Sequence, residues 1–248
     1  MINLLYNALQ KAAIWLLNQV IPPSCLLCSA PHNNDIALIC GPCRDDLPYI
    51  SHPCYQCALP LPTSSGNAAV CGQCLKQPPP FKHCVVPLSY AMPIDSLIAA
   101  FKYRNQLTKG RLLSQLLLAE IWRRYANQPL PEIIVPVPLH WRRQLRRGFN
   151  QSQCVASYLG GQLSIPVQLR RIRRIRRTPS QQGLNKPQRQ RNLKQAFSVT
   201  KPFSGETIAL IDDVMTTGTT CAEISRELLK AGASEVHIWA LARTPVRR

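Results

Sequence analysis

The sequence predicts an α/β protein built on a parallel sheet with helices on both faces, preceded by a small metal-bound module. Three observations lead to this prediction. Four C-x-x-C pairs crowd residues 25–74, where apolar periodicity is poor. Strand-like and helix-like stretches alternate after residue 82. An apolar stretch at 206–212 leads into two carboxylates and a hydroxyl-rich turn, as at the ligand-binding edge of open α/β sheets.

The length and charge of the chain narrow its class. With 248 residues and 46% hydrophobic content, it can bury one α/β core and still carry a small appendage. The formal net charge is +18, from 30 basic against 12 acidic residues. Residues 133–205 contain fifteen of the basic residues and no acidic one. A field of one sign requires a polyanion, a phosphorylated ligand or a membrane surface opposite it.

The cysteine pairs predict two zinc sites. A C-x-x-C turn offers two of the four thiolates that tetrahedral Zn²⁺ requires. The eight candidate ligands are Cys25, Cys28, Cys40, Cys43, Cys54, Cys57, Cys71 and Cys74. Intervals of eleven and thirteen residues favour sequential pairing into a double zinc ribbon, and interleaved pairing stays open. We expect both zinc ions to supply folding free energy rather than catalysis.

The remaining cysteines indicate a reducing compartment. Cys84, Cys154 and Cys221 make an odd number, which suits free thiols rather than a disulfide framework. The sequence shows no secretory signal and no apolar stretch long enough to span a bilayer. We therefore expect a cytoplasmic protein.

The predicted domain order is an amphipathic N-terminal helix in 1–22, a double zinc ribbon in 23–76 and an α/β domain in 82–248. An N-terminal helix that docks its apolar stripe on the protein is favoured over one that lies on a membrane or a partner. Residues 171–194 show neither the helical nor the strand periodicity of apolar residues, which predicts a loop that could hold a short hairpin. Expected strands are 83–90, 132–137, 206–212 and 235–242, and expected helices are 94–103, 110–126, 150–160 and 218–231.

The turn after the third expected strand carries the most specific chemistry. Asp212 and Asp213 offer acceptor-only carboxylates, which suit the vicinal hydroxyls of a ribose. A helix start with hydroxyl and glycine residues can hold a phosphate through backbone N–H groups. The alternative is an ordinary strand–turn–helix with a threonine-rich cap. The turn residues are Thr216, Thr217, Gly218, Thr219 and Thr220.

This stretch, I-A-L-I-D-D-V-M-T-T-G-T-T, resembles the phosphoribosyl pyrophosphate (PRPP) signature of type I phosphoribosyltransferases. The resemblance implies that Asp212 and Asp213 hold the ribose 2′- and 3′-hydroxyls. It also implies that residues 216–220 surround the 5′-phosphate, and that Mg²⁺ arrives with the pyrophosphate. The expected fold class is therefore a type I phosphoribosyltransferase-like sheet behind a zinc-ribbon module.

Further motifs resemble the ComF family of bacterial competence proteins. They are R-R-G-F-N-Q at 146–151, F-K-Y-R at 101–104 and the multi-pair cysteine module. The resemblance implies a role in natural transformation, with single-stranded DNA and proteins of the DNA-uptake machinery as partners. Candidate contacts to pyrophosphate or nucleic acid are Lys102, Tyr103, Arg104, Arg146 and Arg147.

No catalytic residue can be assigned from the sequence. Thr216 stands where purine-salvage relatives often place an Asp, and residues 171–194 contain no acid. Two hypotheses remain: a DNA-handling competence protein with a PRPP pocket, and a true Mg²⁺-dependent phosphoribosyltransferase of unknown acceptor. A PRPP-sensing regulator ranks behind both, because no DNA-reading helix is recognisable.

Overall fold

The structure is a computed structural model that describes residues 24–32, 38–62, 69–139, 145, 147–175 and 195–245. The chain divides into two compact units, Met1–Leu47 and Pro48–Arg248. The predicted N-terminal helix lies outside the described residues. Within them, no helix combines the length and apolar character needed to cross a membrane.

The first unit contains a short helix, α2 (Gly41–Asp45). The helices of the second unit are α3 (Gly72–Lys76), α4 (Ile94–Tyr103), α5 (Leu107–Arg124), α7 (Gln151–Leu163) and α9 (Thr219–Lys230). Its strands are β1 (His83–Val85), β2 (Leu88–Ser89), β3 (Ile133–Pro136), β4 (Ile172–Arg174), β5 (Phe197–Val199), β6 (Thr207–Met215) and β7 (Glu235–Arg243). The bounds of α4, α5, α7 and α9 agree with the predicted ones to within three residues.

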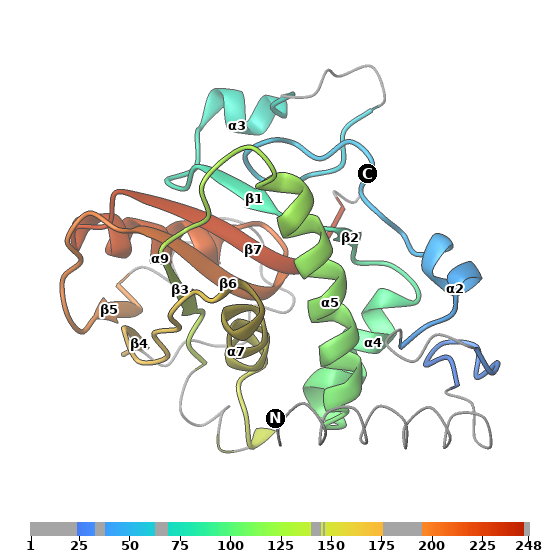
Figure 1. The fold of residues 1–248 in the computed structure, drawn as a ribbon. Helices are drawn as coiled ribbons and strands as arrows, with labels where there is room; N and C mark the ends of the chain where they lie inside the picture. Colours follow the sequence, from blue (N-terminus) through green and yellow to red (C-terminus); the bar gives the residue numbers. More distant parts are fainter. Residues whose placement is uncertain are drawn as a thin grey trace, which may run out of the picture. The chain divides into compact units, whose positions relative to one another are not determined.

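The predicted parallel sheet is confirmed (Figure 1). Its strand order is β1-β7-β6-β3, all pairs are parallel, and β2 also pairs in parallel with β7. The stretch 83–90 forms two strands instead of the single one expected, because the chain is interrupted at Pro87, which has no N–H to donate. The expected loop at 171–194 begins instead with a strand, β4, which forms a separate antiparallel pair with β5. Residues 176–194 lie outside the described part of the chain.

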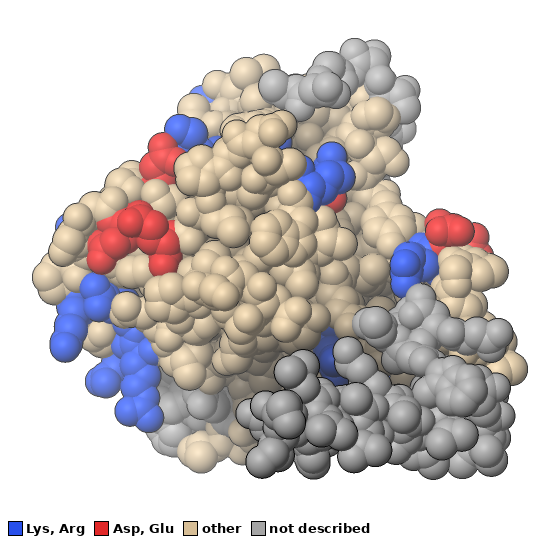
Figure 2. All heavy atoms as spheres, in the orientation of Figure 1, with Lys and Arg blue, Asp and Glu red and all other residues tan. Residues whose placement is uncertain are grey.

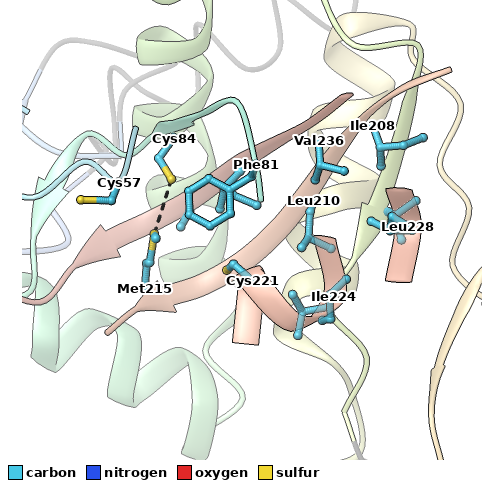
Figure 3. Packing of buried hydrophobic residues seen from close by; sticks show 14 of the residues in the cluster. Cys57, Phe81, Cys84, Ile208, Leu210, Met215, Cys221, Ile224, Leu228 and Val236 are labelled. Atoms are coloured by element: carbon cyan, nitrogen blue, oxygen red, sulfur yellow. Dashed lines mark hydrogen bonds between the residues drawn. The ribbon is translucent and has the colours of Figure 1, made fainter. Parts of the chain in front are cut away.

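Helices cover both faces of the sheet, which the alternation of side chains along β7 makes clear. Val236 and Ile238 point into a core shared with α9, where Ile224 and Leu228 lie (Figure 3). The intervening residues of β7 face α5, which packs on β1 and β7. α7 packs on β3 and β6. Strands buried on both faces are typical of parallel sheets, and β3 is buried at every position.

β6 is longer than predicted at its carboxyl end. The sequence predicts that the strand ends at Asp212, but its pairing with β7 continues to Met215, which lies opposite Arg243. On its other side β6 loses its neighbour sooner, because the β3 pairing stops where Pro136 meets Ile211. The sheet edge is therefore stepped, and the two carboxylates lie on the part of β6 that has no β3 neighbour rather than beyond the strand.

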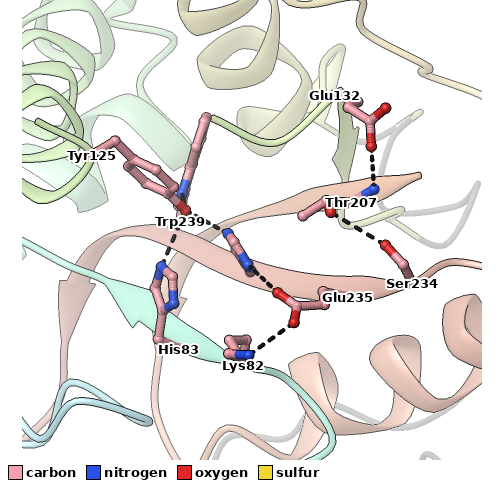
Figure 4. A network of polar contacts seen from close by, with 9 residues as sticks. Lys82, His83, Tyr125, Glu132, Thr207, Ser234, Glu235 and Trp239 are labelled. Atoms are coloured by element: carbon pink, nitrogen blue, oxygen red, sulfur yellow. Dashed lines mark hydrogen bonds and ion pairs between the residues drawn. The ribbon is translucent and has the colours of Figure 1, made fainter. Parts of the chain in front are cut away.

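A buried polar network ties β7 to α5 and β1 near the amino end of the sheet (Figure 4). The His237 Nε2 lies 3.3 Å from Glu235 and donates to it, which leaves Nδ1 to accept a hydrogen bond from the Tyr125 hydroxyl at 2.7 Å. The Tyr125 oxygen in turn accepts from Trp239 Nε1 at 3.1 Å and from His83 Nε2 at 3.2 Å. Burial lowers the pKa of His83 to about 3 and also lowers that of His237, so both rings are neutral near pH 7.

Removal of the central hydroxyl tests this network. Tyr125→Phe leaves Trp239 Nε1 and His237 Nδ1 buried without a partner, and we expect the free energy of unfolding to fall by roughly 2–4 kcal/mol. Urea denaturation at pH 7 measures the change. Tyr158→Phe, on α7 and outside the network, is the control and should change stability by less than about 0.5 kcal/mol. Equal effects of the two substitutions would contradict the network's contribution.

Candidate functional site

The acidic pair lies where the connections that leave two adjacent strands go to opposite faces of the sheet. β3 leads into α7 on one face, and β6 leads into α9 on the other. Such a change of face opens a crevice at the carboxyl ends of the strands, where open α/β sheets bind their ligands. The topology therefore places Asp212, Asp213 and the hydroxyl turn at the expected ligand-binding edge.

Lys102 reaches this edge from the end of α4. Its Nζ lies 2.8 Å from Asp213 Oδ2, and both side chains are only 17% exposed. Although burial works against the ammonium, the Asp213 carboxylate, and Asp212 behind it, raise the pKa of Lys102 above its ordinary value. Lys102 therefore carries its charge throughout the neutral range.

The packing of α4 explains why Lys102 points to the sheet. Lys102 follows Ile98 by one helical turn and shares the buried face of α4 with it. The neighbouring Phe101 lies against Gly110, where an added Cβ would come within 2.5 Å of the ring. The Phe101 ring also packs on Phe149, with 5.6 Å between centroids. Gly110 thus permits the close approach of α5 that fixes the end of α4.

The carboxyl group of Asp212 lies where ionisation is unfavourable. Burial and the neighbouring Asp213 carboxylate raise its pKa to about 7, while Lys102 acts in the opposite direction. Its Oδ1 accepts a hydrogen bond of 2.9 Å from the backbone N–H of Asp213, and its Oδ2 lies 3.6 Å from the Cys221 thiol. The pair therefore holds less than two full negative charges near pH 7.

The turn after β6 is closed by its own hydroxyls and by a glycine. Thr217 Oγ1 and Thr219 Oγ1 are 2.8 Å apart. Gly218 adopts a φ of 73°, which favours glycine, and begins α9 without a side-chain oxygen to offer the first-turn N–H groups. A Cβ at this position would also come within 2.8 Å of the Met215 methyl. Gly218 thus presents backbone directly at the start of α9.

The remaining predicted contacts are brought together in part. Arg147 Nη2 lies 3.3 Å from the Tyr103 hydroxyl, its guanidinium covers the Tyr103 ring at 4.9 Å, and its Nη1 lies 3.1 Å from Gln151 Oε1. Arg104 ends α4 and is exposed. Arg146 lies outside the described residues. Tyr103 and Arg147 therefore form one cation–π pair near the end of α4.

The eight ribbon cysteines form two clusters that pair sequentially. One cluster holds Cys25, Cys28, Cys40 and Cys43 and the other Cys54, Cys57, Cys71 and Cys74, with the sulfur atoms of each within 4.8 Å of one another. A Zn–S distance of about 2.3 Å places two thiolates about 3.8 Å apart on the edge of a tetrahedron. The observed Cys28–Cys40 and Cys57–Cys71 sulfur distances are 3.8 and 3.6 Å. The clusters thus fit two structural zinc ions.

Thiolate character supports this fit. A hydrogen bond from the Cys57 thiol, with others from backbone N–H groups, lowers the pKa of Cys54 to about 4. The N–H of Cys71 is one of these donors, at 3.2 Å from the Cys54 sulfur. In the first cluster, burial opposes ionisation of Cys25, but backbone N–H groups lower its pKa to about 6. Each cluster therefore contains one cysteine that favours the thiolate, while hydrogen bonds among the thiols raise the pKa of Cys43 and Cys57.

Two residues of the site were not anticipated. Cys221, in the first turn of α9, contacts Asp212, and only the fold brings them together. Arg243 ends β7, is 7% exposed, and donates hydrogen bonds to carbonyls of the turn. Its signal was a lone cation at the end of the apolar strand H-I-W-A-L-A-R.

Family models match both parts of the chain. A double zinc ribbon domain matches residues 16–75, and a phosphoribosyl transferase domain matches residues 145–248. The second match includes the acidic pair and the hydroxyl turn.

Curated relatives cover nearly the whole chain. The DNA utilization protein YhgH of Salmonella typhi is 38% identical over 90% of this chain and 98% of its own length. Competence protein F of Haemophilus influenzae is also 38% identical, over 82% of this chain and 84% of its own length. Competence protein ComFC of Bacillus subtilis is 26% identical over 89% and 95%.

The two acids should respond oppositely to amide substitution. The folded pKa of Asp212, about 7, lies above the ordinary 3.8, so its contribution favours folding at low pH and is lost as the pH rises through 7. Asp212→Asn should therefore raise stability at pH 8 by roughly 1–4 kcal/mol, and the gain should shrink toward pH 4. Asp213→Asn should lower it by roughly 2–5 kcal/mol, because Lys102 is left buried without a partner.

Guanidinium denaturation of both variants and wild type at pH 4, 6 and 8 provides the comparison. A loss of stability at pH 8 in both variants would contradict the unfavourable ionisation assigned to Asp212.

Proposed function

Because the chain belongs to the family of competence protein F and the DNA utilization protein YhgH, we propose that it is a PRPP-binding, phosphoribosyltransferase-like protein of DNA uptake and utilisation. The observation that carries the proposal is the acidic pair on the step of β6, directly before a hydroxyl turn and a helix start. A scaffold without a ligand has no physical need for two adjacent, largely buried carboxylates. A reducing compartment, the cytoplasm, suits zinc sites that require free thiolates.

Each part of the proposed pocket binds one part of PRPP. Asp212 and Asp213 accept hydrogen bonds from the vicinal ribose hydroxyls. The backbone N–H groups at the start of α9, with the hydroxyls of Thr216, Thr217, Thr219 and Thr220, bind the 5′-phosphate. Gly218 allows the phosphate to approach the backbone closely.

Lys102 gives the pocket a positive counter-charge. Its ammonium forms an ion pair with Asp213. Once the carboxylates bind ribose hydroxyls, the same ammonium can swing toward the pyrophosphate, and Arg147 and Tyr103 beside the end of α4 extend the positive surface. Mg²⁺, bound mainly by ligand oxygens, would neutralise further pyrophosphate charge.

A second, basic surface supports contact with single-stranded DNA. Figure 2 shows Lys and Arg side chains gathered over the region of β4 and β5, where Arg170, Arg171, Arg173 and Arg174 lie close together along the chain. A cavity of about 260 Å³ opens beside them, lined also by Pro138 and Leu139 beyond the end of β3. A strand that follows these arginines would run past the carboxyl end of the sheet. DNA-uptake proteins are then the expected protein partners.

Catalysis is the second candidate. It is favoured by Lys102, which is buried beside the acids where it could stabilise a departing pyrophosphate. Release of pyrophosphate from PRPP on addition of a purine, pyrimidine or amine acceptor would establish it. Saturable PRPP binding without turnover of any acceptor would leave the binding role alone.

PRPP binding can be tested at Asp212. Asp212→Asn removes an acceptor-only group, and we expect PRPP affinity to fall roughly a hundredfold, the equivalent of one or two charge-assisted hydrogen bonds. Calorimetry with Mg²⁺ measures it. Wild-type affinity should also fall more steeply than that of the variant as the pH drops through about 7, where Asp212 takes up a proton.

Glu206→Gln, at the opposite end of β6, is the matched control and should bind as wild type. Unchanged affinity in Asp212→Asn would remove the acidic pair from the pocket.

DNA binding can be tested on the basic surface. Arg170→Gln with Arg173→Gln should weaken binding of an oligo-dT strand and reduce the slope of log K against log salt by about 0.7 for each phosphate that is no longer neutralised. Fluorescence anisotropy measured from roughly 50 to 300 mM salt, where salt increasingly screens the charges, gives both the DNA affinity and its salt dependence. Arg123→Gln with Lys230→Gln removes the same charge from α5 and α9, and should leave the slope unchanged. Identical slopes in both double variants would exclude this surface.

A further inference from the structure

Arg243 joins three segments that are distant in sequence. Its Nε donates to the Cys57 carbonyl at 3.0 Å, although the two residues are 186 positions apart. Its Nη1 donates to the carbonyls of Met215, at 3.0 Å, and of Thr216. A further bond of 3.0 Å goes to Thr244. One guanidinium thus links a ligand of the second cysteine cluster to the first residues of the hydroxyl turn.

The buried positive charge of Arg243 requires a nearby negative charge. Its side chain is almost fully buried, and among the described residues its hydrogen bonds go to carbonyls, with no ion pair to a carboxylate. A buried cation without an anion is destabilising. Four thiolates around Zn²⁺ carry a net charge of −2, so a loaded second cluster supplies the missing negative charge beside the Cys57 carbonyl. The position of Arg243 therefore fits a zinc-loaded ribbon.

A cavity lies between the hydroxyl turn and the second cysteine cluster. This cavity of about 120 Å³ separates Cys57 and Cys74 from Thr217, Gly218 and Thr219, and Arg243 lines it. Met215 also lines the cavity, and it belongs to the same core cluster as Cys57 and Cys84 (Figure 3). Arg243 is thus the polar link across a gap that side chains do not fill.

We infer that Arg243 is a positioning residue that makes the shape of the phosphate-binding turn depend on the second zinc site and not on the first. The Arg243 guanidinium fixes the carbonyls of Met215 and Thr216, and this orients the N–H groups that follow them. The assignment of phosphate to the turn rests on the proposed function, whereas the coupling between ribbon and turn does not. Cys54, Cys57, Cys71 and Cys74 thereby acquire a role in ligand binding as well as folding.

Cys74→Ser and Cys43→Ser form a matched pair, since each removes the last ligand of one cluster. Neither substitution alters a hydrogen-bond partner of Arg243 directly. Arg243→Lys is the third variant, because it keeps the positive charge but cannot reach all the carbonyls at once. Zinc content, hydrogen–deuterium exchange of residues 214–220 and calorimetric PRPP affinity are measured for each.

We expect Cys74→Ser and Cys43→Ser each to lose one zinc ion per chain. Cys74→Ser and Arg243→Lys should speed exchange in the turn and weaken PRPP binding roughly tenfold, the equivalent of one charge-assisted hydrogen bond. Cys43→Ser should leave the turn as in wild type. Arg243→Lys should keep both zinc ions. If Cys74→Ser fails to fold, Arg243→Lys therefore still tests whether Arg243 couples the second zinc site to the turn.

Wild-type exchange in Arg243→Lys, or equal effects of Cys43→Ser and Cys74→Ser, would overturn the inference. Failure of the wild-type protein to bind PRPP would instead reject the proposed function, because the exchange measurement needs no ligand.

Discussion

The site depends on a step in the sheet: β6 continues past the end of β3 while it remains paired with β7. This one-sided pairing keeps the backbone of Asp212 and Asp213 within the sheet and leaves it without a neighbouring strand on the β3 side. The helices connected to β6 pack on opposite faces, so a crevice opens at the same point. A longer β3 would cover the acids, and a shorter β6 would release them into a loop. The position of both carboxylates is therefore a consequence of strand length.

Charges gather around this step and are balanced in different ways. Lys102 is neutralised by Asp213, whereas Arg243 is surrounded by carbonyls near a cysteine cluster. Within the described part of the chain no cation forms an ion pair with Asp212, and its burial beside the Asp213 carboxylate raises its pKa to about 7. An unfavourable charge of this kind is expected where a site is shaped for a ligand rather than for stability. The hydroxyls of a bound ribose would then donate hydrogen bonds to the Asp212 carboxylate and stabilise its charge.

The sequence predicted those features that lie within short segments. The C-x-x-C spacing indicated two four-cysteine clusters, and the alternation of strands and helices indicated the parallel sheet; both are confirmed. The ion pair of Lys102 with Asp213 and the bond from Arg243 to Cys57 join distant segments, so no local pattern could specify them. A signal existed for Lys102, because a lysine one turn after Ile98 stands on an apolar helix face. The end of β6 was misplaced because two carboxylates resemble the start of a turn, and only the register with β7 extends the strand.

The most direct test of the proposed ribose-phosphate site is calorimetric titration of the protein carrying both zinc ions with PRPP and Mg²⁺, repeated in the presence of a short single-stranded oligonucleotide. We predict saturable binding of one PRPP per chain that persists or strengthens when DNA is bound. An absence of PRPP binding together with salt-sensitive DNA binding would contradict this prediction, and would mean that the acids and the hydroxyl turn do not form a ribose-phosphate site.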